Sequence, residues 1–333
     1  MSRVEKFFIT LANFFPAWVV GGACLALWDP ATATWFQPTW IPLFLGIIML
    51  SMGLTLSLDD FLRVIQIPRS IALGVGLQYT IMPLLGFSLG TLLHLPMDYV
   101  IGMILVACCP GGTASNVVCF IARSNIALSV SLTAVSTLAA VIITPLLTTL
   151  MIESISRSSI GVPIQVDTIG LLINTFKIVI LPVTVGALLN HYFRKWVKKI
   201  NPYTPFIAVM SIVFIVDFIL AAKKEEIIST GPTLIFAVVT LHALGFTLGY
   251  FLSKLLKLSE KNSQTISIEV GMQNSGLATE LARSNFPDFS LATVPGAISA
   301  LTHCVFGSIA AGLCRLKGNY KKHSIQAGDE SFL

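Results

Sequence analysis

A glutamate, two side-chain amides and a hydroxyl lie close together in the sequence ISIEVGMQNSGLA. Glu269 stands among apolar residues, and Gln273, Asn274 and Ser275 follow it between two glycines. Carboxylate and amide oxygens, together with backbone carbonyls, are the ligands that hard cations take in proteins. The segment therefore predicts a cation site, and sodium is the expected ion. A protonated glutamate that bonds to a neighbouring helix is the structural alternative.

A second segment, CCPGGTASNVV, has the same combination of a weak helix and polar side chains. Pro110 lacks a backbone donor, and the glycine pair that begins at Gly111 disfavours a continuous helix. Thr113, Ser115 and Asn116 follow at once with side-chain oxygens. In a membrane the freed backbone groups must be buried in protein or line a wet cavity. The alternative is a proline kink in which the hydroxyls bond back to carbonyls.

Composition shows that both segments belong to a membrane protein. The chain has 333 residues, of which 55% are hydrophobic and only 11% charged, and its mean hydropathy is +0.83. A soluble protein carries about 25% charged residues, so lipid must cover much of this surface. An acidic residue at membrane depth costs roughly 2.5–3.5 kcal/mol on insertion scales. No lysine or arginine shares the span of Glu269 before Arg283, so a cation from solution is the expected partner.

The apolar segments predict an all-α polytopic protein. A membrane-spanning helix needs about 20 mostly apolar residues, and short connections leave no room for a separate soluble domain. The expected spans are Leu11–Trp28, Thr39–Leu56, Ile71–Leu93, Tyr99–Ile121, Ile126–Met151, Ile169–Leu189, Phe206–Ala222, Pro232–Leu252, Thr265–Ala282 and Phe289–Leu313.

Basic residues alternate in abundance between successive connections. The richer side has Arg3, Lys6, Arg63, Arg69, Arg123, Arg194, Lys195, Lys198, Lys199, Lys254, Lys257, Lys261, Arg315, Lys317, Lys321 and Lys322, and the other has Arg157, Lys223, Lys224 and Arg283. Because cytoplasmic loops are rich in Lys and Arg, both termini are expected in the cytoplasm, with the protein in the cell membrane. This distribution accounts for the net charge of +5 without nucleic acid as a partner.

A short repeat relates the two helix-breaking segments. ARSN occurs at Ala122–Asn125 and again at Ala282–Asn285, 160 residues later, and at this offset Ser115 aligns with Ser275. Each break then falls in the fourth helix of a five-helix half. Because five is odd, the second half must be inverted, as in secondary transporters. The expected units are residues 1–153, residues 164–315 and a cytoplasmic tail at 316–333.

Other polar residues lie at spacings that bring them toward this site. Ser129, Thr133, Ser136 and Thr137 recur along one face of the fifth helix, where their hydroxyls face the gap in the fourth or simply allow close helix packing. Gln78 inside the third helix is ambiguous by itself. Six cysteines lie in or beside apolar segments without metal-type spacing, which favours free packing residues.

Taken together, the motifs resemble the bile acid:sodium symporter family in its compact bacterial form. The matching stretches are CCPGGTASNV, ALSVSLTAVST, IEVGMQNSGLA, FLGIIMLSMGLTL and VPGAISALTH. The resemblance implies a panel domain of helices 1, 2, 6 and 7 and a core domain of helices 3–5 and 8–10. It also implies that broken helices 4 and 9 cross, that two sodium ions bind behind the crossing and that an organic anion binds between the domains.

The resemblance carries site residues onto this chain. For the first sodium it implies Ser115, Asn116, Ser129, Thr133 and Glu269; for the second it implies Gln78, Glu269, Gln273 and the carbonyls of Val270 and Met272. For the substrate it implies Gly112, Thr113, Asn274 and His303.

The sequence departs from the family at a few positions. Related chains often have His-Asn where this chain has His242-Ala243 and His303-Cys304. The loss of both amides bears on the substrate preference and not on the sodium sites. Asp217 is an unusual charge inside the seventh helix, facing either the crevice or water near the helix end.

The function expected from these observations is sodium-coupled symport by alternating access. The substrate would be an organic anion, either bile-acid-like or a small carboxylate such as pantoate, with sodium ions and the lipid bilayer as the other partners and no obligatory protein partner. A proton-coupled or sodium-independent exporter or uniporter is the first alternative. An intramembrane enzyme is the second, but the chain has no GxSxG or HExxH motif.

Overall fold

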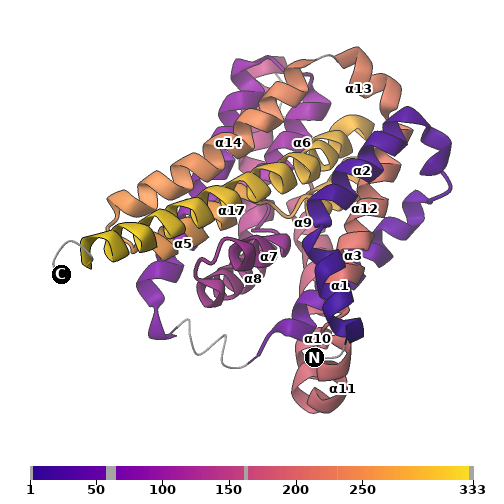
Figure 1. Ribbon diagram of the computed structural model, residues 1–333. Helices are drawn as coiled ribbons and strands as arrows, with labels where there is room; N and C mark the ends of the chain where they lie inside the picture. The colour runs from indigo at the N-terminus through magenta and orange to yellow at the C-terminus, as the bar shows by residue number, and fades with distance from the viewer. Residues whose placement is uncertain (1–2, 58–64, 161–163, 231, 330–333) are drawn as a thin grey trace.

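The computed structural model describes residues 3–57, 65–160, 164–230 and 232–329, and within them every regular element is helical. Seven helices in these described ranges are long and apolar enough to cross a membrane: Pro38–Thr55, Pro68–Leu92, Ile126–Arg157, Thr168–Tyr192, Thr204–Ala222, Pro232–Leu255 and Ser290–Leu316. Phe15–Trp28 and Met97–Cys108 are shorter apolar helices. Their length and composition indicate a multi-pass membrane protein, and Figure 1 shows how the helices are arranged. Arg63, one of the basic residues used to orient it, lies outside the described residues.

One group of helices packs together through close backbone contacts. It comprises α2 (Phe15–Trp28), α3 (Ile41–Thr55), α10 (Leu181–Tyr192) and α12 (Thr204–Ala222). The contact between α3 and α10 depends on two glycines, because a Cβ on Gly186 would lie 2.5 Å from the carbonyl oxygen of Leu50 and 2.8 Å from the Cα of Gly53. Side chains at either position would force these helices apart.

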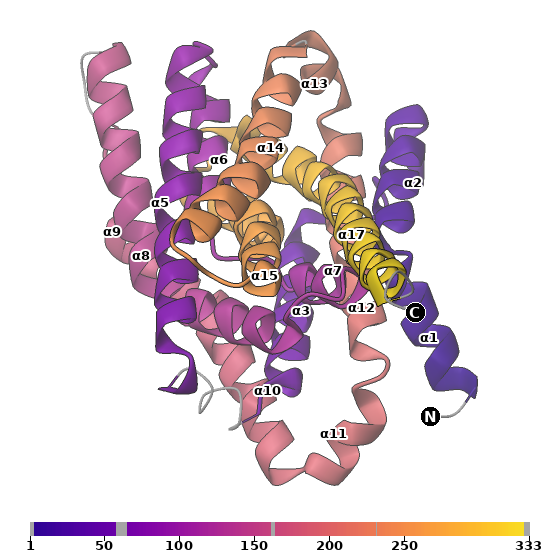
Figure 2. The same ribbon diagram turned by 60° about the vertical axis from the view of Figure 1, so that its left-hand side comes forward.

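A second group packs around the Glu269 segment. It contains α5 (Pro68–Leu92), α6 (Met97–Cys108), α8 (Ile126–Ile160), α14 (Pro232–Leu255), α15 (Glu260–Gly271) and α17 (Val294–Asp329). In Figure 1, α14 and α17 run side by side, and Figure 2 shows α15 toward the middle of the assembly. Glu269 and its neighbours in α15 are buried, so the segment that carries the carboxylate is covered by protein.

Two helices are interrupted, and their interruptions contact each other. The break between α6 and α7 (Ala114–Ile121) meets the break between α15 and α16 (Ser275–Asn285), where Gly111 and Gln273 pair as a short antiparallel bridge. The Gly112 N–H donates to the Met272 carbonyl at 2.8 Å, and the Asn274 N–H donates to the Pro110 carbonyl at 2.9 Å. Each break therefore supplies the backbone partners that the other lost, which is how broken helices are tolerated at membrane depth.

Remaining elements connect these groups. They are α1 (Arg3–Asn13), α9 (Thr168–Thr175), a π-helical turn at Phe176–Ile180, α11 (Arg194–Ile200) and α13 (Lys224–Thr230), with 3₁₀ turns at Pro30–Thr32, Pro38–Trp40 and Ser290–Thr293.

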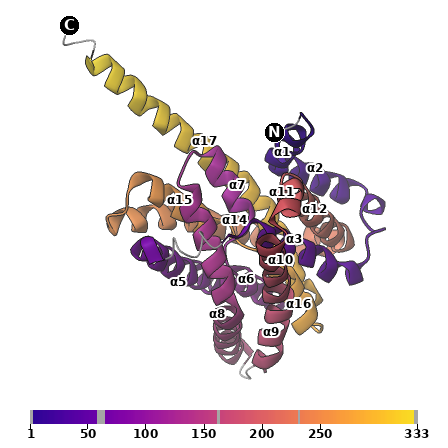
Figure 3. The same cartoon turned by 90° about the horizontal axis from the view of Figure 1, so that it is seen from below.

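Two helices continue past the ends predicted from hydropathy. Helix α8 extends to Ile160 rather than Met151, and α17 continues to Asp329, through most of the expected tail. Figure 3 shows α17 extending beyond the other helices. Hydropathy reports only the apolar part of a helix, so polar extensions are missed.

Candidate functional site

Glu269 is surrounded by hydroxyl groups from two other helices. Its side chain is 4% exposed, and its Oε1 accepts a hydrogen bond from the Ser115 hydroxyl at 2.6 Å. The Ser129 hydroxyl also donates to Oε1, and the Thr133 hydroxyl lies 3.1 Å from Oε1 and 3.0 Å from Oε2. Asn116 joins this group because its Oδ1 lies 2.8 Å from the Ser129 hydroxyl. We call these five residues the carboxylate cluster.

The helix geometry explains how the cluster forms. Ser129 and Thr133 are four residues apart in α8 and so project from one face of it. Ser115 and Asn116 belong to the first turn of α7, just after the break. Gly111 leaves room for the carboxylate, because a Cβ there would lie 2.7 Å from Glu269 Oε2. The helix break and the buried charge are therefore structurally connected.

The chemistry of the cluster suits a hard cation. The Thr133 hydroxyl lies within hydrogen-bonding distance of the Ser129 carbonyl and of both carboxylate oxygens, but it has one proton to donate. The Ser129 hydroxyl is likewise close to both Asn116 Oδ1 and Glu269 Oε1. The oxygen atoms of the cluster therefore offer more lone pairs than the hydroxyl groups have protons to donate. A bound cation would interact with the lone pairs that remain.

A second group of oxygens lies beside the contact between the two helix breaks. Gln78 Nε2 donates to Gln273 Oε1 at 2.9 Å and approaches the Cys109 carbonyl at 3.2 Å. Gln273 Nε2 donates to the Val270 carbonyl at 2.8 Å. Gln78 Oε1 is buried and has no hydrogen-bond partner among the described residues. A buried oxygen without a donor, close to the carbonyl groups of a helix break, is also a fitting ligand for a cation.

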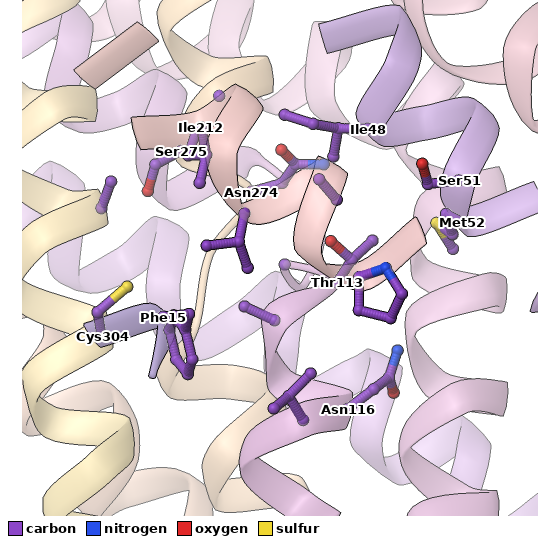
Figure 4. Close-up of a pocket in the computed structure, with 18 of the residues that line it drawn as sticks. Phe15, Ile48, Ser51, Met52, Thr113, Asn116, Ile212, Asn274, Ser275 and Cys304 are labelled. Carbon is purple, nitrogen blue, oxygen red and sulfur yellow. The ribbon is translucent and has the colours of Figure 1, made fainter. Parts of the chain in front are cut away.

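The two contacting helix breaks also form one wall of a pocket. All four residues implied for the substrate line it: Gly112, Thr113, Asn274 and His303. Side chains from α2, α3, α12 and α17 complete the wall, and Figure 4 shows Phe15, Ile48, Met52 and Cys304 around the same space. Asn116 and Gln273 line this pocket while they contact the two oxygen groups behind it. The pocket and the oxygen groups thus share residues.

Asn274 has a structural role that sequence reasoning missed. Its Oδ1 accepts a hydrogen bond from the Leu277 N–H at 3.1 Å and so caps the N-terminus of α16. The signal was present, since asparagine is a preferred N-cap residue and it directly precedes a new helical segment. Ser136 and Thr137 do not join the carboxylate cluster, because Ser136 bonds to the Thr133 carbonyl and Thr137 contacts Met52.

Two acidic residues have contacts outside the carboxylate cluster and the pocket. Glu280, a buried carboxylate not singled out from the sequence, pairs with Arg283 in α16 through bonds of 2.8 and 2.7 Å. Asp217 does not line the pocket but lies against Gly22 of α2.

Gly111→Ala should weaken sodium binding about tenfold or more with little loss of stability. The new methyl group would lie too close to Glu269 Oε2, so the flexible carboxylate must move away from the hydroxyls. Changes to groups that only orient a metal ligand typically cost about 10–100-fold in affinity, so displacing the ligand itself should cost at least about tenfold. Sodium-dependent thermal stabilisation of the purified protein measures the change. Gly76→Ala in α5, where a Cβ contacts nothing within 4 Å, is the control; equal sodium affinity in both variants contradicts the assignment.

Comparison with known proteins assigns the chain to a family of membrane transporters. The combination of apolar helices, two contacting breaks and an oxygen-rich centre defines a polytopic membrane transporter. Residues 42–230 match the Sodium Bile acid symporter family. The chain belongs to this family, which confirms the resemblance seen in the motifs and excludes an enzyme.

Relatives from plants and bacteria extend over most of the chain. The "Probable sodium/metabolite cotransporter BASS1, chloroplastic" of Arabidopsis thaliana is 44% identical over 305 residues, covering 92% of this chain and 74% of the relative. The "Uncharacterized sodium-dependent transporter YocS" of Bacillus subtilis (strain 168) is 42% identical over 332 residues, covering 99% and 98% of the two chains. The similarity to these transporters therefore extends over nearly the whole chain.

Proposed function

We propose that this protein is a symporter that couples sodium to the movement of an organic anion by alternating access. The observation that carries the proposal is the sharing of Asn116 and Gln273 between the pocket and the oxygen groups behind it. A cation that orders these side chains also orders the pocket wall. Sodium binding would therefore complete the site for the anion.

Two sodium ions are the proposed stoichiometry. The first would bind in the carboxylate cluster, with Glu269 supplying the charge. The second would bind near Gln78 and Gln273, with the carbonyls of Val270 and Met272; this group contains the buried Gln78 Oε1 without a donor among the described residues. The Arabidopsis relative is named a probable sodium/metabolite cotransporter, which agrees with coupling to sodium.

The N-terminal ends of two helices favour an anion in the pocket. Residues at the start of α7 and α16, including Thr113, Ala114, Ser275 and Gly276, line its wall. The first backbone N–H groups of a helix have no partner within the helix and carry partial positive charge. A small carboxylate such as pantoate or a bile-acid-like anion would be bound there.

We infer ten spans arranged as two inverted five-helix repeats, with both termini in the cytoplasm of a cell. The breaks support this arrangement, because Gly111 and Gly271 are separated by the same offset of 160 as the two ARSN motifs. The group formed by α2, α3, α10 and α12 corresponds to the panel, and the group around α15 to the core. Transport would move the core against the panel.

Replacement of sodium tests the proposal directly. In proteoliposomes with an inward sodium gradient, uptake of a radiolabelled carboxylate such as pantoate or taurocholate should exceed uptake in choline by at least about tenfold, because the ion orders the anion site. A proton gradient imposed in choline serves as the second arm. Equal uptake in sodium and choline would favour the sodium-independent exporter or uniporter, and uptake driven by protons alone would favour proton coupling.

A further inference from the structure

A chain of hydrogen bonds connects the broken end of α15 to the pocket. The His242 ring is fully buried, with Nδ1 2.8 Å from the Gly271 carbonyl and Nε2 2.7 Å from the Ser299 hydroxyl. The Ser299 hydroxyl lies 2.7 Å from the Ser275 hydroxyl, which lies 3.4 Å from His303 Nδ1. This polar chain is separate from both oxygen groups described above.

The direction of every bond in this chain follows from its first member. A carbonyl only accepts, so His242 Nδ1 must carry the proton that it donates to Gly271. A fully buried imidazole between a carbonyl and a hydroxyl is neutral, because an unpaired charge is costly to bury. His242 Nε2 is then an acceptor, and the Ser299 hydroxyl donates a hydrogen bond to it.

The same logic continues to the pocket. The Ser299 hydroxyl uses its one proton to donate a hydrogen bond to His242. The Ser275 hydroxyl must therefore be the donor in its hydrogen bond with Ser299. Ser275 then has no proton left for His303, so His303 Nδ1 is the donor between them. A neutral histidine protonated on Nδ1 has a lone pair on Nε2. His303 lines the pocket, and its Nε2 has no hydrogen-bond partner among the described residues.

We propose that His242, Ser299 and Ser275 act as positioning residues that fix His303 as a hydrogen-bond acceptor facing the substrate. The ligand would therefore carry a hydroxyl or N–H donor as well as its carboxylate. Ser275 is the first residue of α16 and contacts His303, so the acceptor lies beside the helix end proposed for the anion. A donor close to the carboxylate, as in a 2-hydroxy acid, fits this arrangement. The ligand class rests on the proposed anion site, whereas the protonation of His303 does not.

Nitrogen NMR of the full-length protein tests the protonation pattern without any ligand. In protein labelled with ¹⁵N-histidine, His242 and His303 should each show a protonated Nδ1 and an unprotonated Nε2, with His303→Gln identifying the second set of signals. Ser299→Ala frees the Ser275 proton to bond to His303 Nδ1. His303 should then change to the Nε2–H form that free histidine favours, while His242, still donating to Gly271, should not.

Ser308→Ala is the matched control, because Ser308 lies in the same helix and bonds only to the Cys304 carbonyl one turn earlier. It should leave both histidine patterns unchanged. An Nε2–H signal from His303 in the unmodified protein overturns the proposal, as does a His303 pattern that is the same in Ser299→Ala.

Matched ligands test the selectivity. In sodium, 2-hydroxy-3-methylbutanoate should bind about tenfold tighter than its 2-methoxy counterpart, since one net hydrogen bond contributes about 1 kcal/mol or slightly more. Ser299→Ala should reduce this preference to about twofold, and Ser308→Ala should retain it.

The outcomes separate the two proposals. Equal, sodium-dependent binding of the hydroxy and methoxy acids overturns the inference about His303 and leaves the symporter intact. Binding that is the same in sodium and choline contradicts sodium coupling. Absence of binding by the hydroxy acid overturns the proposed ligand class, whereas the NMR result still decides the role of the positioning residues.

Discussion

Glu269→Gln is expected to lower sodium affinity by about 100-fold or more and to abolish sodium-driven uptake. Glu269 is the one carboxylate in the carboxylate cluster, and its oxygens contact Ser115, Ser129 and Thr133. Changes to groups that merely orient metal ligands cost about 10–100-fold, so removal of the charged ligand itself should exceed that. Sodium-dependent thermal stabilisation and uptake in proteoliposomes measure the two effects.

The variant should remain folded, because an amide of nearly the same size can still accept hydrogen bonds from the surrounding hydroxyls. Glu153→Gln is the matched control. Glu153 lies 20 residues after Thr133 in α8, or about 30 Å along the helix, so sodium affinity should not change. Sodium stabilisation of Glu269→Gln equal to that of the unmodified protein would show that the ion binds elsewhere.

The positions of the helix breaks were predictable from local sequence. Pro110 with the following glycines comes directly after α6, and α15 ends at Gly271, as expected from the weak helix propensity of proline and glycine. The pairing of Gly111 with Gln273 was less accessible. Residues so far apart in the chain are related only through the repeat and the family resemblance, and neither specifies which backbone groups bond.

Some residues that interact across helices could be predicted from their spacing in the sequence, and others could not. The spacing of Ser129 and Thr133 predicted a common face, and both contact Glu269. The same pattern included Ser136 and Thr137, which bond elsewhere. They lie seven and eight residues after Ser129, about two helical turns further along the axis, and this separation places them outside the carboxylate cluster. His242 and Ser299 bond across 57 residues of sequence without any periodic signal, so only the fold reveals them.

The geometry also supplies a physical route by which the proposed ion sites and the pocket would be coupled. The two breaks hold each other by backbone bonds between Gly112 and Met272 and between Asn274 and Pro110. A cation bound at the proposed sites on one side of this short bridge would therefore alter the same backbone that lines the pocket on the other. Such coupling requires differential contacts in the two states, and the shared side chains Asn116 and Gln273 can provide them.

Arg283→Leu is expected to destabilise the protein by about 3 kcal/mol, the largest stability effect that we anticipate for a single surface-reaching side chain. Glu280 has a side chain that is only 3% exposed, and Arg283, which is 34% exposed, binds it with two hydrogen bonds. Removing one partner of a buried pair leaves the other charge uncompensated and costs about 3–5 kcal/mol. The partial exposure of Arg283 places the expected value at the lower end.

A double-mutant cycle isolates this effect from the loss of packing. Replacing both partners, Glu280→Leu with Arg283→Leu, should recover most of the stability, because an apolar pair of similar volume is often neutral or better. Thermal or denaturant unfolding in detergent compares the four proteins under fixed sodium. If the double variant is as unstable as Arg283→Leu alone, the arginine contributes through its packing and not by neutralising Glu280. Sodium affinity should be unchanged throughout, since this pair lies within α16 and belongs to neither of the proposed sodium sites.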